Sequence, residues 1–95
     1  MFHHEKTAVA SGGVATVTGI KYEGDKFMVY VKDVTAGTGN VTITVNPGDS
    51  DEAQAIAGTN TINLSNPIAL VLEGRVNKVI GTGSGSDAFT LCVLS

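Results

Sequence analysis

The C-terminal stretch GTGSGSDAFTLCVLS, Gly81 to Ser95, decides between two kinds of fold. Alternating glycines suit a phosphate-binding loop, but such a loop needs a strand before it and a helix after it. The strand pattern RVNKVI does precede the glycines. The residues after them, AFTLCVLS, alternate apolar and small side chains as a strand does, and the stretch lacks the lysine of a P-loop. We therefore predict that residues 81–86 form a hairpin connection between the last two strands and hold no anion.

The rest of the chain also has the periodicity of strands. VTITV (Val41–Val45) places a β-branched residue at every position and alternates valine or isoleucine with threonine. KFMVYVKDV (Lys26–Val34) alternates similarly, and the turn residues at Glu23–Asp25 predict an antiparallel hairpin with the preceding VATVTGIKY. Further strands are expected in NTINL, IALVLEG and RVNKVIG, and EKTAVA is expected to add an edge. The fold class predicted is all-β, an antiparallel β-sandwich or barrel of seven to eight short strands.

The segment IALVL, Ile68 to Leu72, is apolar on both faces of its predicted strand. Two interpretations are open. Either the strand is central in its sheet, which we favour, or its outer face meets another subunit. The second interpretation makes Ile68, Leu70 and Leu72 candidate partner-contact residues.

A single segment departs from the strand pattern. PGDSDEAQAIAGTN has a capping-box spacing between Asp49 and Glu52 and a glycine stop at Gly58, which predict at most one short helix near residues 50–57. A long polar loop is the alternative. The acidic cluster Asp49–Glu52 supplies only the first ligands of a calcium loop, so helix capping explains it better.

Length and charge limit the classes of function. Ninety-five residues predict a single domain, residues 1–95, with residues 1–6 as a flexible N-terminal arm. The net charge is −3 and the basic residues are scattered, so no nucleic-acid partner is expected.

Only 16% of residues are charged, which fits either a threonine-rich β surface or a surface covered by a partner. No apolar run is long enough for a signal peptide or a membrane span, so synthesis in a cytoplasm and no membrane partner are expected.

Catalytic groups are few. The two histidines, His3 and His4, lie beside Met1, so a Ser–His or Cys–His nucleophile is not expected. Adjacent side chains of an extended segment point in opposite directions, so this pair is not expected to hold a metal. Cys92, the one cysteine, has no disulfide partner in the chain and is interpreted as a small buried hydrophobe.

Carboxylate chemistry is the remaining enzymatic reading. A glycosidase would need Asp33 or Glu73 in a groove with aromatic platforms, for which Tyr22 and Tyr30 are the candidates. We predict no enzymatic activity and no cofactor.

The stretch LVLEGRVNKVIGTGSGSDAFTLCVLS, Leu70 to Ser95, resembles the final hairpin of small β-sandwich structural proteins of tailed-phage virions. The capsid decoration or cement proteins and the head-fibre proteins are the types it resembles. The resemblance implies a homo-oligomer, often a trimer, that binds a major capsid protein or another virion protein and resides in the virion. It also implies that the arm MFHHEK is a contact element, with Phe2 as an apolar anchor beside His3 and His4. The alternative function is a small glycan- or ligand-binding module of an adhesin-like assembly, with Tyr22 or Tyr30 on a concave face.

Overall fold

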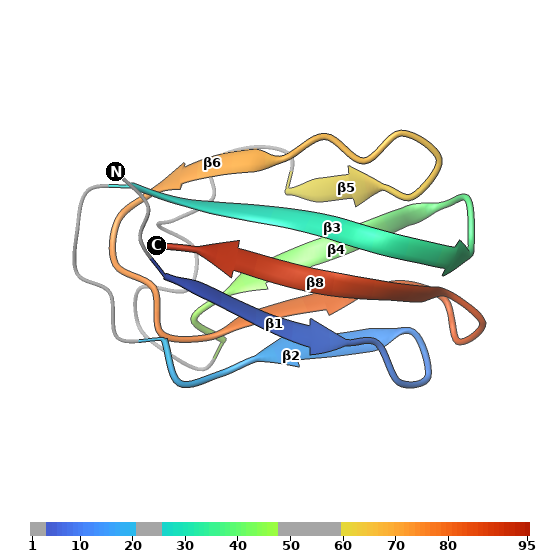
Figure 1. The fold of residues 1–95 in the computed structure, drawn as a ribbon, viewed down its shortest axis with the longest axis horizontal. Helices are drawn as coiled ribbons and strands as arrows, with labels where there is room; N and C mark the ends of the chain where they lie inside the picture. Colours follow the sequence, from blue (N-terminus) through green and yellow to red (C-terminus); the bar gives the residue numbers. More distant parts are fainter. Residues whose placement is uncertain (1–3, 21–25, 48–59) are drawn as a thin grey trace.

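The computed structural model describes residues 4–20, 26–47 and 60–95, and these residues form eight strands and no helix. Figure 1 shows the strands as arrows. They are β1 (Glu5–Val9), β2 (Val14–Val17), β3 (Lys26–Ala36), β4 (Asn40–Val45), β5 (Thr61–Asn63), β6 (Leu70–Glu73), β7 (Val79–Thr82) and β8 (Ala88–Leu94).

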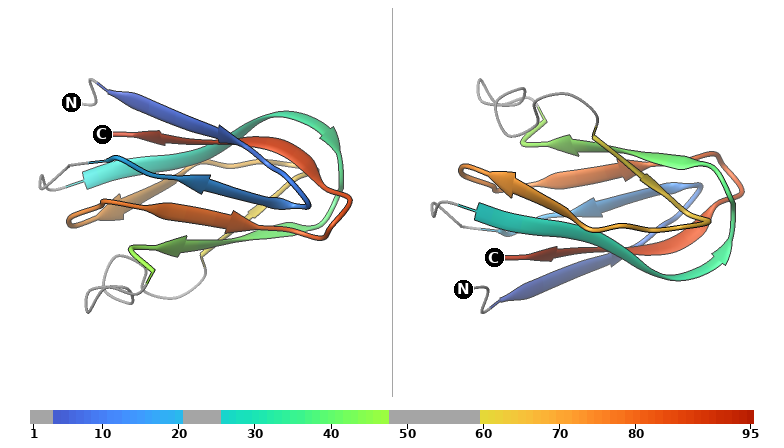
Figure 2. Two further views of the ribbon diagram at one scale, coloured as in Figure 1. Left: turned by 90° about the horizontal axis from the view of Figure 1, so that it is seen from below. Right: turned by 90° about the horizontal axis from the view of Figure 1, so that it is seen from above.

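The strands form two four-stranded antiparallel sheets, with the orders β1-β8-β3-β6 and β2-β7-β4-β5. The first strand therefore pairs with the last, the second with the seventh, the third with the sixth and the fourth with the fifth. This nested pairing is that of a jelly roll, a sandwich built from two Greek keys. Figure 2 shows the sandwich from its two long sides. The predicted all-β sandwich of seven to eight strands is confirmed.

Alternation along each strand supplies the core between the sheets. In β4, Val41, Ile43 and Val45 are fully buried while Thr42 faces solvent, as the alternation in VTITV predicts. Each such side chain contributes about 1.5–3 kcal/mol when it leaves water. Both sheets contribute to one cluster, whose largest members are Phe27, Phe89, Ile43, Ile62 and Leu91.

Both predicted hairpins are wrong. β2 belongs to the second sheet and β3 to the first, and β7 and β8 are divided between the sheets in the same way. The strands on either side of each predicted turn therefore belong to different sheets. Apolar alternation identifies which face of a strand is buried and does not identify the neighbouring strand, because either sheet buries the same face.

The edge prediction for EKTAVA is confirmed, since β1 is an edge strand of the first sheet. The favoured central position for IALVL is wrong, because β6 is the other edge of that sheet and Val71 is 54% exposed. The predicted helix near residues 50–57 and the cluster Asp49–Glu52 lie outside the described residues.

The glycine-rich stretch between β7 and β8 is a closed turn. The N–H of Gly83 donates to the carbonyl of Gly13 at 2.7 Å, and the N–H of Ser84 donates to the Asp87 carboxylate at 2.8 Å. The N–H of Asp87 donates back to the carbonyl of Ser84 at 3.0 Å. Two N–H groups that a bound phosphate would need are thus already donated within the chain.

Candidate self-association surfaces

The sandwich has two long sides, each formed by one edge strand from each sheet. We call the side formed by β1 and β2 the β1/β2 side, and the opposite one, formed by β5 and β6, the β5/β6 side. Figure 1 places the first along the lower margin and the second along the upper margin. Edge strands carry backbone groups that no strand of their own sheet pairs, so the sides are where another chain can add.

The exposed large apolar residues of the described chain gather on these two sides. Val9 of β1 is 75% exposed and Val14 of β2 is 39% exposed. On the opposite side, Ile68 is 66% exposed just before β6, and Val71 within β6 is 54% exposed. None of the described residues on the four inner strands belongs to this group. The distribution concentrates exposed apolar surface at the two open sides.

The hydrogen-bond pattern of β1 shows which backbone groups face outward. The pair His4 and Ser95 exchange two backbone hydrogen bonds of 2.9 Å, and Ala10 donates to Phe89 at 2.9 Å. In an antiparallel ladder the bonded residues alternate with residues whose N–H and C=O point the other way. The backbone groups of the odd-numbered residues, Glu5, Thr7 and Val9, therefore point to the free edge.

The β5/β6 side contains an open pocket of about 340 Å³ between its two edge strands. Its apolar lining comes from Ile62, which is buried, together with Ile68 and Leu70. Its polar lining comes from Asn40, Thr61, Asn63 and Asn66. A cavity of this size with a mainly apolar floor accepts side chains or a small ligand.

The side chain of Asn63 holds the rim of this pocket in place. Its Nδ2 donates to Oδ1 of Asn40 at 2.9 Å, and its Oδ1 accepts from the N–H of Ser65 at 2.9 Å and of Asn66 at 3.2 Å. Ser65 adds a hydroxyl hydrogen bond of 3.0 Å to the carbonyl of Thr38. The amide of Asn63 is thus committed to the loop between β5 and β6, and the pocket is preformed.

The outer face of the first sheet carries a second cluster. The Tyr30 hydroxyl donates to the Glu5 carboxylate, so β3 is bridged to β1 across β8, whose Cys92 lies opposite Tyr30 on β3 and Thr7 on β1. This hydrogen bond and burial raise the pKa of Tyr30 above its ordinary value. Burial raises the pKa of the Cys92 thiol. Cys92 is fully buried, as predicted, but it faces away from the core and beneath this bridge.

The sequence-predicted contact residues divide into three groups. Ile68 and Leu70 come together at the pocket, and Leu70 and Leu72 both pack against the core. His4 is exposed at the start of the described chain. Phe2, His3 and Tyr22 lie outside the described residues. Sequence reasoning missed Val9, Val14 and Val71.

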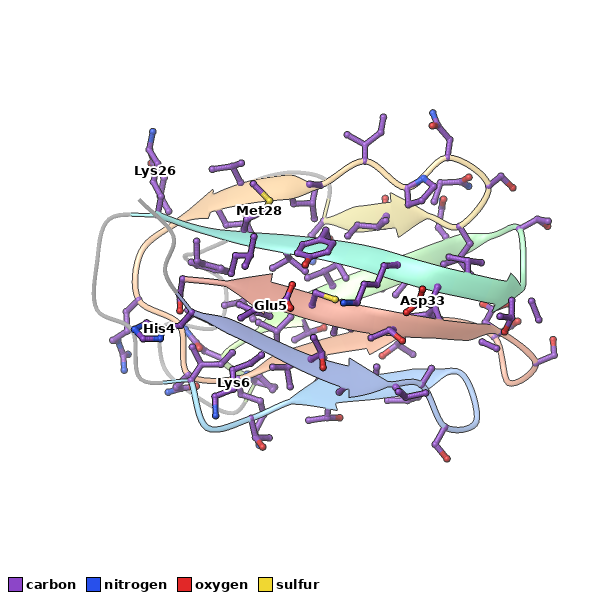
Figure 3. All side chains as sticks on the ribbon, in the orientation of Figure 1. His4, Glu5, Lys6, Lys26, Met28 and Asp33 are labelled. Atoms are coloured by element: carbon purple, nitrogen blue, oxygen red, sulfur yellow. The ribbon has the colours of Figure 1, made fainter. Side chains whose placement is uncertain are left out.

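The two carboxylates considered for glycosidase chemistry lie apart. In the strand register Glu73 lies opposite Lys26, at the start of β3, and Asp33 is near the other end of β3 (Figure 3). At about 3.3 Å per residue the separation is roughly 23 Å, against the roughly 5–9.5 Å that a carboxylate pair needs. The described residues contain no group of three or more potential metal ligands. They also contain no helix long and apolar enough to cross a membrane.

No family model matches the chain, and no curated protein matches it. A solved chain described under "Bacillus endospore appendages form a novel family of disulfide-linked pili" aligns with 96% of this chain and 81% of its own length. The TM-score is 0.56 and the sequence identity is 16%. The likeness at this identity is one of fold. These comparisons do not link the chain to phage virion proteins.

Proposed function

We propose that this protein is a non-enzymatic structural subunit that associates side by side with copies of itself. The observation that carries the proposal is the gathering of exposed large apolar side chains, Val9, Val14, Ile68 and Val71, on the two open sides of the sandwich. Exposed apolar groups clustered on an open edge favour a protein partner. The fold shared with a subunit of disulfide-linked pili supports an assembly role.

The proposed assembly is held by non-covalent contacts. The chain has a single cysteine, and Cys92 is fully buried beneath the bridge between Tyr30 and Glu5. A disulfide between copies would need that thiol at the surface and ionised, and burial opposes both conditions. Association therefore depends on strand edges and apolar packing.

The glycan-binding alternative has less support. The pocket offers asparagine side chains, but the amide of Asn63 already binds Asn40, Ser65 and Asn66. Tyr30 also uses its hydroxyl within the chain, toward Glu5. A sugar that hydrogen-bonds to Asn63 or Tyr30 would have to displace these hydrogen bonds, and that displacement costs free energy.

The resemblance of Leu70–Ser95 to phage virion proteins gives the proposal a finer form. In that form the self-associated protein decorates a virion and binds its major capsid protein. The test is co-sedimentation of the protein with virions of the phage that encodes it. Binding that saturates at a fixed number of copies per capsid supports the finer form, and absence of binding refutes it without affecting self-association.

Self-association itself is tested by measuring mass in solution over a concentration series, with negative-stain electron microscopy of the same samples. We expect species larger than one chain whose share rises with concentration, and rings or filaments in the images. A single species of 9.7 kDa at every concentration would contradict the proposal.

A further inference from the structure

We infer that the copies join head to tail, with Val9 and Val14 on the β1/β2 side of one copy docking at the pocket on the β5/β6 side of the next. This inference rests on the proposed function and specifies its partner, which is a second copy of this chain. The interface is therefore made of two different surfaces.

Strand direction permits this arrangement in both sheets at once. Each sheet has four strands that alternate in direction, so its two edge strands run oppositely. When a copy is displaced sideways without being turned over, its β1 meets β6 of the neighbour, and its β2 meets β5, in antiparallel orientation. Antiparallel pairing is the arrangement that both sheets already use.

The two surfaces also lie at the same position along the strand direction. Across the second sheet, Val14 is opposite Thr82, Thr82 is opposite Thr42, and Thr42 is opposite Thr61. Val14 therefore lies in the same row as Thr61, which lines the pocket. The turn after Val9 and the loop before β6 are at one end of the sandwich, on the right in Figure 1. A sideways displacement thus brings the valines to the pocket with no shift along the strands.

The two surfaces are complementary in shape and polarity. Val9 and Val14 project from one side, and the other side offers a preformed pocket with Ile62, Ile68 and Leu70 in its lining. Joining two like sides would place projecting valines against valines, or one pocket against another. Contacts between unlike surfaces close into a ring or continue as a helical filament, according to the rotation between copies. The twist of the sheets supplies such a rotation.

Two one-sided variants test the inference. The valine variant carries Val9→Lys and Val14→Lys, and the pocket variant carries Ile68→Lys. The control Thr35→Lys matches the pocket variant in charge and places one lysine at an exposed position on β3, an inner strand. Thr35→Lys combined with Thr42→Lys, at an exposed position on the inner strand β4, matches the two charges of the valine variant. All substituted positions are partly or largely exposed, so folding should be retained, and circular dichroism checks this.

Each one-sided variant alone should be monomeric, while the controls assemble like the unaltered chain. An equimolar mixture of the two variants should give a complex of two chains and nothing larger, because only one pair of intact surfaces remains. If either variant alone still assembles, the interface joins like sides and the inference is wrong. A mixture that stays monomeric while the unaltered chain assembles also overturns it.

Failure of the proposed function gives a different result, since the unaltered chain and the controls would then all be monomeric. If a lysine variant unfolds, Val9→Ser with Val14→Ser, and Ile68→Ser, replace it in the same scheme. These smaller changes remove the apolar contact without adding a charge.

Discussion

The ends of the sandwich and its sides are built differently. At one end the side chain of Asn46 binds backbone groups of a distant turn, and at the other end the side chains of Asn63 and Asp87 bind backbone N–H groups of their own turns. No buried side-chain nitrogen or oxygen among the described residues lacks a partner. The two sides instead present edge-strand backbone and exposed valines. The polar groups at the ends are therefore satisfied within one chain, whereas the sides have groups that a second chain can satisfy.

The largest loss of stability is expected at Gly13, where the turn between β1 and β2 contacts the turn between β7 and β8. Gly13 has φ +80°, and a Cβ there would overlap the backbone carbonyl of Ser84. Gly13→Ala should lower the free energy of unfolding by about 4 kcal/mol, through left-handed strain and displaced backbone. Gly12→Ala is the control, since Gly12 has φ +61° but open space around it, and should cost only about 1 kcal/mol. Denaturant unfolding measures both, and equal losses would refute the steric part of the argument.

A slightly smaller loss of stability is expected at Asn46, at the other end of the sandwich. Asn46 is 1% exposed, has φ 52°, donates to the carbonyl of Arg75 at 2.9 Å and accepts from the N–H of Asn77 at 2.8 Å. Asn46→Ala leaves these backbone groups without the side chain that binds them and removes a residue suited to positive φ, costing about 3 kcal/mol. The exposed Asn66 provides the comparison, because Asn66→Ala should change stability by no more than about 0.5 kcal/mol. Thermal or denaturant unfolding of the two variants measures the two losses of stability, and equal losses would contradict the role given to Asn46.

Asn63 connects an end to a side, so its removal should affect both stability and association. Asn63→Ala should cost about 1–2 kcal/mol, because the lost hydrogen bonds are largely exposed to water. It should also weaken self-association, since the loop carrying Ile68 loses its support. Mass measurements at a temperature well below unfolding separate the two effects. Unchanged association would show that self-association does not depend on the support that Asn63 gives this loop.

The smallest effect concerns the bridge that holds edge strand β1. The pKa values of Tyr30 and Cys92 are raised from ordinary values of 10.0 and 9.0, so the folded state favours their neutral forms. Their contribution to stability is complete below those ordinary values and is lost as the pH rises above them. We expect the free energy of unfolding to decline in alkaline solution above about pH 9, and to decline less in Tyr30→Phe. A flat profile for the unaltered chain would contradict this.

Much of the fold was predictable because its local signal is strong. VTITV and KFMVYVKDV identify their strands and their buried faces by alternation alone. Strand partners were not predictable in this way, because tight turns serve equally well between neighbours in one sheet and between sheets. The doubly apolar IALVL has two physical explanations, and burial in the centre of a sheet was the wrong choice.

The candidate surfaces were predictable only in part. Ile68 and Leu70 were identified because an apolar run stands out in a polar chain, and both line the pocket. Val9 and Val14 are single valines in polar surroundings, and only their position on edge strands gives them significance. The role of Asn46 depends on Arg75 and Asn77, which are about thirty residues away in sequence, and no spacing rule brings them together.

The position of β8 has a consequence for how the protein is made. β8 lies between β1 and β3 in the first sheet, yet it follows both of them in the chain. On the ribosome, β1 and β3 must wait until β8 has emerged before that sheet can close. A nascent chain therefore lacks a completed sheet edge, so the self-association proposed for β1 would have to wait until translation has passed β8.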